Sequence, residues 1–331
     1  MSTPLSPAVS VVIPLYNKVD LVAKAIESVL NQDFEDFEII IVDDGSTDGS
    51  TQVAQGYAER LGGLCTYVRQ ERAGAGAARN RGMRIASGEF IALLDADDLW
   101  APEKLSRQIG FMEAHQDIDW SATNYFIVDG AQTEPVAALP HEGGGSSDPW
   151  RIVDWFSAMA DEEIFIQTSG VVLRRSLVER VGEFDESIPS GQDFDYWVRA
   201  GEAAPRCGYC TMPCYTYIKN STYSISFNEP SRYTGKIDML TRLMKRSTQP
   251  DRPQAYQDLI RTLSEDVTRR LIAEGHLDVA RSLLRSFPEH WRALRHAGYL
   301  ILTYVPVPIV RFMTLARLRV FDWFRHRSQS V

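Results

Sequence analysis

Short apolar segments alternate with helix-like segments over the first hundred residues, and this alternation is the strongest constraint on the fold. Runs rich in β-branched residues, typical of buried strands, occupy residues 9–13, 37–42, 64–68 and 90–94. Apolar residues recur at helical spacing around 19–30, 53–61 and 77–86, and a further helix is expected to begin near Pro102. Strands that are apolar on both faces and joined by helices predict an α/β fold, a doubly wound mixed sheet, mostly parallel, flanked by helices.

The second half of the chain contains a candidate domain boundary. The 331 residues are enough for one large α/β domain and an appendage. Residues 129–149 are rich in Gly, Pro and Ser and predict a loop, whereas the polar, Pro-containing residues 247–254 predict a boundary. Beyond it, helical patterns cover 255–273 and 276–286. We therefore expect a first domain at 1–246 and a C-terminal helical region at 255–331.

The C-terminal tail has a charge opposite to that of the body. Residues 281–331 contain nine Arg and two acids, a formal +7, which leaves −16 for the rest because the whole chain carries −9. From residue 309 apolar side chains gather on one side of a helical wheel, which favours a helix lying on an anionic membrane surface. A basic helix packed on the acidic body, or on a second subunit, is the alternative. The acidic total disfavours nucleic-acid binding.

Targeting and cysteine signals favour the cytoplasm. The N-terminus lacks the basic and apolar regions of a signal peptide, and the longest apolar run, 297–310, is too short to span a bilayer. We expect a cytoplasmic protein, peripheral on the inner face of the cell membrane. Cys207, Cys210 and Cys214 are expected to be structural thiols rather than a zinc site, because no fourth ligand follows at a matching spacing. Their strand is expected to be interrupted at Pro213.

Acidic residues cluster at the ends of two predicted strands. Asp43 and Asp44 follow the second strand, and Asp95, Asp97 and Asp98 follow the fourth. Parallel strands place their carboxyl ends at one edge of the sheet, where ligands bind in such folds. Converging carboxylates repel one another, and Mg²⁺ or Mn²⁺ would relieve the repulsion. The alternative is that acids after strands are helix caps, Asp48 and Asp98 among them.

Four motifs carry a resemblance to a known family. They are SVVIPLYNK at 10–18, DDGSTDGS at 43–50, GAARNRG at 76–82 and GEFIALLDADD at 88–98. In this order and spacing they resemble the family 2 glycosyltransferases of GT-A fold, of the type that builds bacterial cell-surface polysaccharides. The resemblance covers roughly residues 9–230. It implies transfer of a hexosyl group from a nucleoside diphosphate sugar, most often a UDP-sugar, to a saccharide or lipid-linked saccharide.

The resemblance also implies roles for individual residues. Pro14 and Tyr16 would frame the nucleotide base, Asp44, with Asp43 as the second candidate, would accept a hydrogen bond from it, and Arg79 would lie near the nucleotide. Asp95 and Asp97 would be the family's Asp-x-Asp motif, with Asp97 the direct metal ligand and Asp98 in support. The bound metal would neutralise charge on the leaving nucleoside diphosphate. Gly74 and Gly76 could let the backbone approach the ligand.

A further acidic residue matches the family's catalytic base. In residues 190–199 the family usually has Glu-Asp, and this chain has Gln192-Asp193. Asp193 would accept the acceptor's proton during a single displacement that inverts the anomeric carbon. Asp195 is a weaker candidate. The alternative is that Asp193 is the N-cap of a helix at 194–199.

Two other functions compete with this one. A nucleotidyltransferase acting on sugar phosphates can share the fold and the paired Asp ligands, but its Gly-rich and basic phosphate loop is missing after the first strand. A protein that binds sugar nucleotides without transferase activity would be expected to have lost Asp97 or Asp193. The sequence leaves the sugar, the acceptor and the oligomeric state open.

Overall fold

The computed structural model describes residues 6–129, 136–137, 148–188, 191–219, 242, 245 and 254–286. The chain divides into two compact units, Met1–Glu229 and Pro230–Val331. The boundary that the sequence places at 247–254 stays a prediction. The predicted loop at 129–149 falls mainly outside the described residues.

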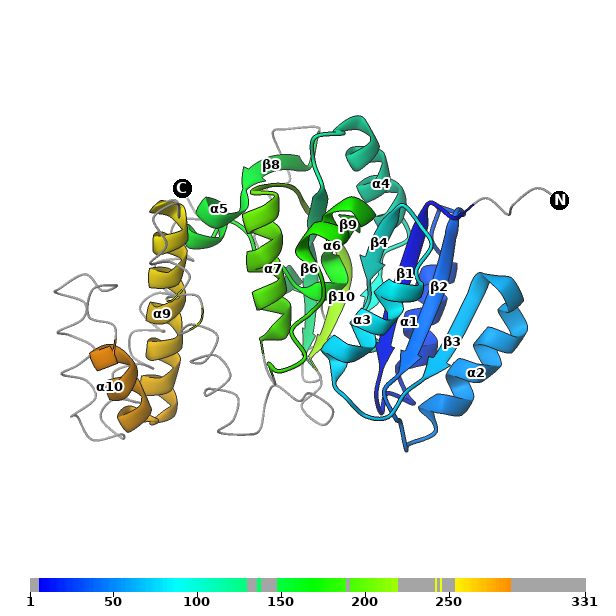
Figure 1. The fold of residues 1–331 in the computed structure, drawn as a ribbon, viewed down its shortest axis with the longest axis horizontal. Coiled ribbons are helices and arrows are strands. Elements are labelled where there is room, and N and C mark those ends of the chain that lie inside the picture. Colours follow the sequence, from blue (N-terminus) through cyan, green and yellow to red (C-terminus); the bar gives the residue numbers. More distant parts are fainter. Residues whose placement is uncertain are drawn as a thin grey trace. The chain divides into compact units, whose positions relative to one another are not determined.

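The first unit is built on one large sheet flanked by helices (Figure 1). Its strands are β1 (Val9–Leu15), β2 (Phe37–Asp43), β3 (Cys65–Arg69), β4 (Phe90–Leu93), β5 (Leu99–Trp100), β6 (Trp120–Asp129), β7 (Val136–Ala137), β8 (Trp150–Asp154), β9 (Val172–Arg174) and β10 (Arg206–Lys219). Its helices include α1 (Val22–Leu30), α2 (Ser50–Leu61), α3 (Ala75–Ile85), α4 (Lys104–Ala114), α5 (Trp155–Ala160), α6 (Arg175–Val181) and α7 (Gln192–Ala203), with 3₁₀ turns at Gly62–Leu64 and Thr168–Gly170.

The strand order confirms the predicted fold class. The main path through the sheet is β3-β2-β1-β4-β9-β6-β10-β5, and the β3-β2-β1-β4 part is entirely parallel. Strand β9 pairs antiparallel with both β4 and β6, while β6 and β10 are parallel, so the sheet is mixed. The connections β1-α1-β2, β2-α2-β3 and β3-α3-β4 are the alternation seen in the sequence.

Strand β1 is buried on both faces because helices cover both sides of the sheet. Val9, Val11 and Ile13 belong to the core that contains α1, and Val12 points to the other face, towards α3. A Cβ placed on Gly82 of α3 would lie 2.3 Å from Cγ1 of Val12, so α3 packs so closely on β1 that only glycine fits at this position. This packing explains why the strand sequence is continuously apolar instead of alternating.

One local expectation is confirmed and one differs from the structure. Helix α4 begins at Lys104, near Pro102 as expected. Strand β10 continues through Pro213, with register shifts against β6 on either side of it, so the Pro produces irregular pairing and not the expected break. The four cysteines are free and buried thiols.

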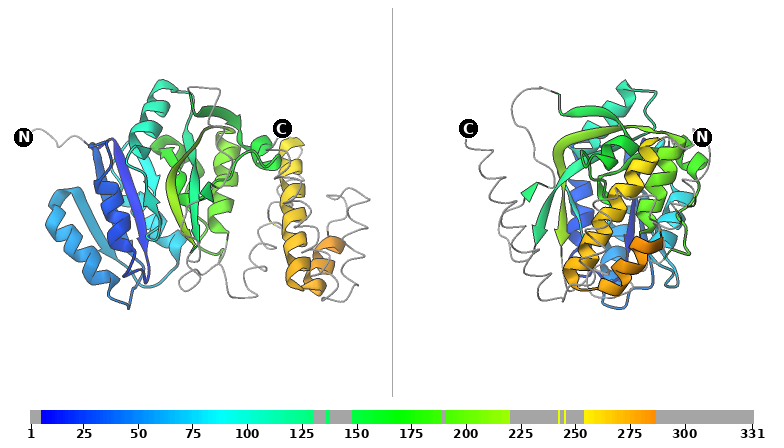
Figure 2. Two further views of the ribbon diagram at one scale, coloured as in Figure 1. Left: turned by 180° about the vertical axis from the view of Figure 1, so that it is seen from behind. Right: turned by 90° about the vertical axis from the view of Figure 1, so that its left-hand side faces the viewer.

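The described part of the second unit is a helical hairpin, as the sequence predicted. Helices α9 (Gln254–Glu274) and α10 (Leu277–Ser286) meet at Gly275, whose φ of 89° ends the first helix (Figure 2). Within the described residues, neither these helices nor any other has the length and apolar character needed to cross a bilayer. Residues 287–331, on which the predicted membrane-binding tail falls, lie outside the described residues.

Candidate active site

The acid-bearing strand ends lie at one edge of the sheet. Strands β2 and β4 both pair with β1 in parallel, β2 on one side and β4 on the other. The chain leaves β2 at Asp43 and leaves β4 just before Asp95. The topology therefore brings Asp43, Asp44 and the 95–98 segment to the same edge, as expected from the sequence.

Asp43 is a buried carboxylate that the protein itself satisfies. It accepts hydrogen bonds from the Thr51 hydroxyl at 2.6 Å, the Tyr67 hydroxyl at 2.8 Å and the Ser46 amide at 2.8 Å. Burial alone would raise the pKa of Asp43, but these hydrogen bonds outweigh burial and lower it. In this arrangement Asp43 holds the turn that follows β2.

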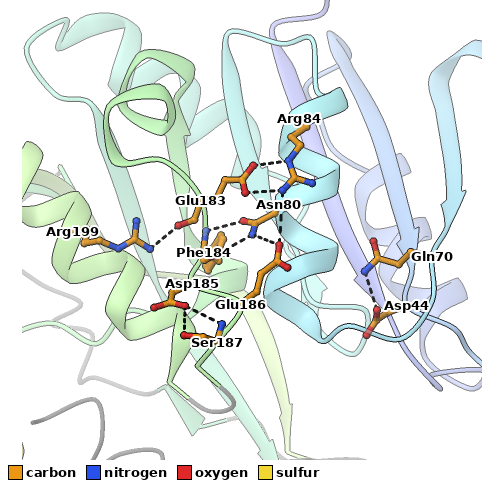
Figure 3. Close-up of polar contacts among 10 residues, drawn as sticks. All are labelled: Asp44, Gln70, Asn80, Arg84, Glu183, Phe184, Asp185, Glu186, Ser187 and Arg199. Atoms are coloured by element: carbon orange, nitrogen blue, oxygen red, sulfur yellow. Dashed lines mark hydrogen bonds and ion pairs between the residues drawn. The ribbon is translucent and has the colours of Figure 1, made fainter. Parts of the chain in front are cut away.

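Asp44 organises the loop between β3 and α3. Its two oxygens accept the amide protons of Ala73 and Gly74 at 2.7 and 2.8 Å, and Gln70 donates to it at 2.9 Å (Figure 3). The same loop carries Arg72, whose guanidinium carbon lies 4.3 Å from the centre of the Tyr16 ring. Pro14, inside β1, is half-buried one residue before the strand ends. Tyr16 and Asp44 are thus linked through one loop, beside the end of β1.

Asp95 and Asp97 each face a cation. Arg79 of α3 donates to Asp95 at 2.6 Å, and the Lys18 ammonium lies 2.5 Å from Asp97. The Arg79 side chain is 6% exposed, while the two carboxylates are 32% and 24% exposed. The Arg79 Nε is buried and has no hydrogen-bond partner among the described residues. The Asp-x-Asp carboxylates are therefore accessible, and the cation beside Asp95 keeps an unused donor.

Asp98 points into the protein. One oxygen accepts the Ser169 hydroxyl at 2.5 Å and the other accepts the Ile218 amide at 3.2 Å. Burial, together with the charges of Asp95 and Asp97, raises the pKa of Asp98 well above its usual value. Asp98 does not cap α4, whose N-cap is Glu103, so that alternative is wrong. Its predicted support of a metal stays a prediction.

The residues at this edge fit a divalent cation that binds together with a ligand. Carboxylate oxygens are what Mg²⁺ and Mn²⁺ prefer, and Mg²⁺ is commonly held by one or two carboxylates and the phosphates of a substrate. The described residues contain no cluster of three or more His, Cys, Asp or Glu placed to hold a metal. Asp95 and Asp97 fit the two-carboxylate arrangement, in which a diphosphate would supply further oxygen ligands.

Asp193 lies in the first turn of α7. The N-cap of this helix is Gly191, in the left-handed conformation at φ 85°, so Asp193 is not the N-cap, although it accepts the Phe194 amide at 2.8 Å. Burial acts to lower the pKa of Arg79, but the charges of Asp95 and Asp193 outweigh it and raise that pKa. The charges of both Asp95, the first Asp of the Asp-x-Asp motif, and Asp193, the predicted base, therefore stabilise the charged form of Arg79. Asp195 is buried and bonded to Arg199 at 2.9 Å.

Gly74 and Gly76 both make contacts inside the protein. A Cβ on Gly76 would meet Oε1 of Gln192, so the glycine makes room for the residue next to Asp193. Gly74, with φ 98°, is the N-cap of α3 and donates its amide to Asp44. The expected approach of their backbone to a ligand stays a prediction.

The sequence did not predict a role for several residues of this region, although some of them lie in the motifs. Lys18 is the last residue of the motif at 10–18, and a cation shortly after the first strand could have indicated a role at this edge of the sheet. Ser169 accepts the Asp95 amide and donates to Asp98, and no local pattern could have paired residues so far apart in sequence. A hollow of about 490 Å³ also lies beside α3, lined by Ala77, Arg81, Arg84 and Glu186 among others, but none of the predicted site residues lines it.

The family model described as glycosyl transferase family 2 matches residues 10–179, which contain all four motifs and the Asp-x-Asp cluster. The chain belongs to this family. Among its relatives, TuaG of Bacillus subtilis, a glycosyltransferase named for teichuronic acid biosynthesis, is 38% identical over 122 residues, which are 37% of this chain and 48% of TuaG. This chain spans between 26% and 64% of the length of the first relatives it matches.

Solved structures show the same fold. TarS 1-349 of S. aureus, in complex with UDP-GlcNAc, matches with a TM-score of 0.64 and 19% identity over 92% of this chain and 88% of that one. The mannosyltransferase PcManGT of Pyrobaculum calidifontis, in complex with GDP-Man and Mn²⁺, matches with a TM-score of 0.56 and 19% identity over 93% and 84%. The fold is therefore GT-A, as the motifs implied.

Proposed function

We propose that this glycosyltransferase moves a hexosyl group from a UDP-sugar to a hydroxyl of a saccharide or lipid-linked saccharide, with inversion at the anomeric carbon. The observation that carries the proposal is the position of Arg79. Its guanidinium bonds Asp95 and feels the charge of Asp193, so one buried cation links the Asp-x-Asp motif with the predicted base. A leaving diphosphate and an attacking hydroxyl must occupy such adjoining places.

The donor side of the proposed mechanism uses residues at the strand ends. Tyr16 offers a ring for the base, opposite Arg72, and Asp44 shapes the loop beside it. Lys18 and Arg79 place two positive charges beside Asp97 and Asp95, where a diphosphate would gain from them. A Mg²⁺ or Mn²⁺ ion held by Asp95 and Asp97 would supply further positive charge to stabilise the leaving nucleoside diphosphate.

The acceptor side uses Asp193 as the base. The acceptor hydroxyl attacks the anomeric carbon while its proton passes to the Asp193 carboxylate, and the bond from that carbon to the diphosphate breaks. A single displacement of this kind inverts the anomeric configuration. The UDP donor is favoured by the TarS complex, and a cell-surface polysaccharide product by the name of TuaG.

The substitution Asp193→Asn tests the proposal. It should reduce transfer by at least about 100-fold, since general bases contribute that much, while UDP and Mn²⁺ still bind. A panel of nucleotide sugars screened with Mn²⁺ for a raised unfolding temperature selects the donor. Nuclear magnetic resonance then gives the anomeric configuration of the product. Retained configuration, or full activity of the variant, would contradict the mechanism.

A further inference from the structure

Both polar atoms of the Asn80 side chain, Oδ1 and Nδ2, form hydrogen bonds with a segment that is distant in sequence. It lies in α3 and is fully buried. Its Oδ1 accepts the amide proton of Phe184 at 2.7 Å, and its Nδ2 donates to the Phe184 carbonyl and to Oε1 of Glu186, both at 2.9 Å (Figure 3). The Asn80 amide therefore pairs with both polar groups of one residue more than a hundred positions away.

A carboxamide is the chemical group that this arrangement requires. The Phe184 amide needs an acceptor, while its carbonyl and the Glu186 carboxylate need a donor. An Asp of the same shape would place its carboxylate against both of these oxygens. An Ala would leave the buried amide and carbonyl without partners.

The segment that Asn80 holds is packed directly against α7. The Phe184 ring stacks on Tyr196 with centroids 4.1 Å apart and planes at 17°. Arg199 donates to the carbonyls of Val181 and Glu183, at 2.9 and 2.8 Å. Helix α7 is thus tied on two successive turns to the residues around Phe184, and the position of Phe184 sets the position of the helix that carries Asp193.

The helix that supplies Asn80 also supplies the donor-side cation. Gly76, Arg79 and Asn80 are three and four residues apart, so they share one face of α3. Gly76 receives Gln192, and the Arg79 guanidinium lies 5.5 Å from the centre of the Phe184 ring besides bonding Asp95. One helix face therefore contacts both the Asp-x-Asp motif and the support of the base.

We propose that Asn80 is a positioning residue for glycosyl transfer. By clamping the Phe184 peptide to α3, it sets the place of Asp193 relative to Arg79 and Asp95. This inference rests on the proposed function, because it takes Asp193 as the base. It assigns the clamp to the transfer step and not to donor binding, since Asn80 touches neither Asp44 nor the Asp-x-Asp carboxylates in the described contacts.

Asn80→Asp and Asn80→Ala test the clamp in the full-length protein. Turnover is followed as UDP released from UDP-GlcNAc, or from the panel sugar nucleotide that the wild type turns over fastest, and binding is measured by calorimetry with UDP and Mn²⁺. We expect kcat to fall about 100-fold, because a misplacement of about 1 Å can cost this much, while the UDP affinity and the donor KM change less than about threefold.

Two further variants provide rescue and a matched control. Glu186→Gln added to Asn80→Asp supplies an amide donor to the new carboxylate and should restore part of kcat, which keeps the test decisive if Asn80→Ala does not fold. Arg84→Gln removes the exposed ion pairs to Glu183 and Glu186, 2.5 and 3.9 Å long, on the same segment but leaves the Phe184 peptide bonded. It should leave kcat within about twofold, since exposed ion pairs contribute little.

The outcomes separate this inference from the proposed function. Wild-type kcat in a folded Asn80→Asp protein, with Asp193→Asn inactive, would overturn the clamp and leave the base in place. An equal loss of kcat and of UDP binding in Asn80→Asp would also overturn it, because the residue would then be needed only for folding. An active Asp193→Asn protein would overturn the proposed base instead.

Discussion

At the scale of single residues, the acids at the sheet edge differ in their exposure and in the groups that their carboxylates contact. Asp43 and Asp98 are buried and take their hydrogen bonds from hydroxyls and backbone amides. Asp95 and Asp97 are partly exposed, and each faces one cation. The first pair is suited to holding the turns after β2 and β4, and the second pair to meeting a ligand.

This difference predicts opposite results for two conservative substitutions. In Asp98→Asn the oxygen can still accept the Ile218 amide and the new amide can donate to Ser169, so activity should stay within about tenfold of wild type. Asp97→Asn should lower turnover about 100-fold, because it removes charge from the place where a metal and a diphosphate would bind. Initial rates at several Mn²⁺ concentrations measure both. An equal loss in both variants would support Asp98 as a metal ligand.

Lys104 predicts a pH dependence of stability. Its ammonium is fully buried, 4.0 Å from the centre of the Trp100 ring and 2.6 Å from Oε1 of Gln108, and burial lowers its pKa to about 7. In the unfolded chain the pKa of Lys104 is near 10.4, so between pH 7 and 10 this side chain binds more protons in the unfolded state than in the folded state. The free energy of unfolding should therefore rise with pH in this window, by about 1 kcal/mol per pH unit from this group.

Urea unfolding of wild type and Lys104→Met at pH 7 and pH 9 isolates that contribution. The variant should lose most of the rise with pH, because it removes the titrating group and keeps a side chain of similar length. A rise of the same size in both proteins would show that other groups cause it.

At the scale of elements, α3 joins the parts of the first unit. One face, with Gly76, Arg79 and Asn80, contacts the loop around Phe184 and the start of α7, the helix that carries Asp193. Gly82 of α3 packs against Val12 of β1, and because it has no side chain the helix can approach the strand closely. The small residue in the motif at 76–82 thus sets how closely α3 approaches the sheet.

Gly82→Ala should therefore destabilise the protein. Alanine favours helices, but its Cβ would lie 2.3 Å from Cγ1 of Val12 inside a packed core, and such overpacking costs about 1–3 kcal/mol. The urea midpoint should fall with an unchanged slope.

Val12→Ala serves as the partner substitution in a double-mutant cycle. The double variant should be more stable than the sum of the two single effects predicts, because the added methyl group fills part of the space that Val12 leaves. Additive effects would show that the two residues are not in contact.

At the scale of the whole molecule, the chain joins a GT-A unit to a helical unit and a basic tail. Most of the tail, residues 287–331, lies outside the described residues, and the predicted membrane association stays a prediction. The formal +7 charge of residues 281–331, opposite to that of the body, is what supports the proposal.

Vesicle sedimentation tests the tail. The full chain should bind vesicles that contain phosphatidylglycerol, bind pure phosphatidylcholine vesicles weakly, and be released by high salt. Removal of the residues from Arg292 onwards should abolish binding and leave soluble protein that turns over sugar nucleotide. An aggregated truncated protein would indicate that the tail packs on the body or on a second subunit.

The local sequence was sufficient for the elements and for their class of fold. Strands β1, β2, β3 and β4 begin within one residue of their predicted starts, since apolar runs and helical spacing are properties of neighbouring residues. The four motifs were enough to indicate the family, and the match over residues 10–179 confirmed it. Asp44 and the Asp-x-Asp residues could be named because they lie inside these motifs, and Asp193 because Gln192-Asp193 matches the place where the family usually has Glu-Asp.

Only the tertiary structure decided how these residues are used. It turned Asp98 inward to Ser169 and Ile218, bonded Arg79 to Asp95 where the charge of Asp193 also raises the Arg79 pKa, and gave Asn80 the Phe184 peptide to hold. Partners so distant along the chain leave no mark on local composition, because their distance depends on how helices pack on the sheet. The chain's own order determines which groups reach the edge of the sheet, and packing determines which of them remain open to a ligand.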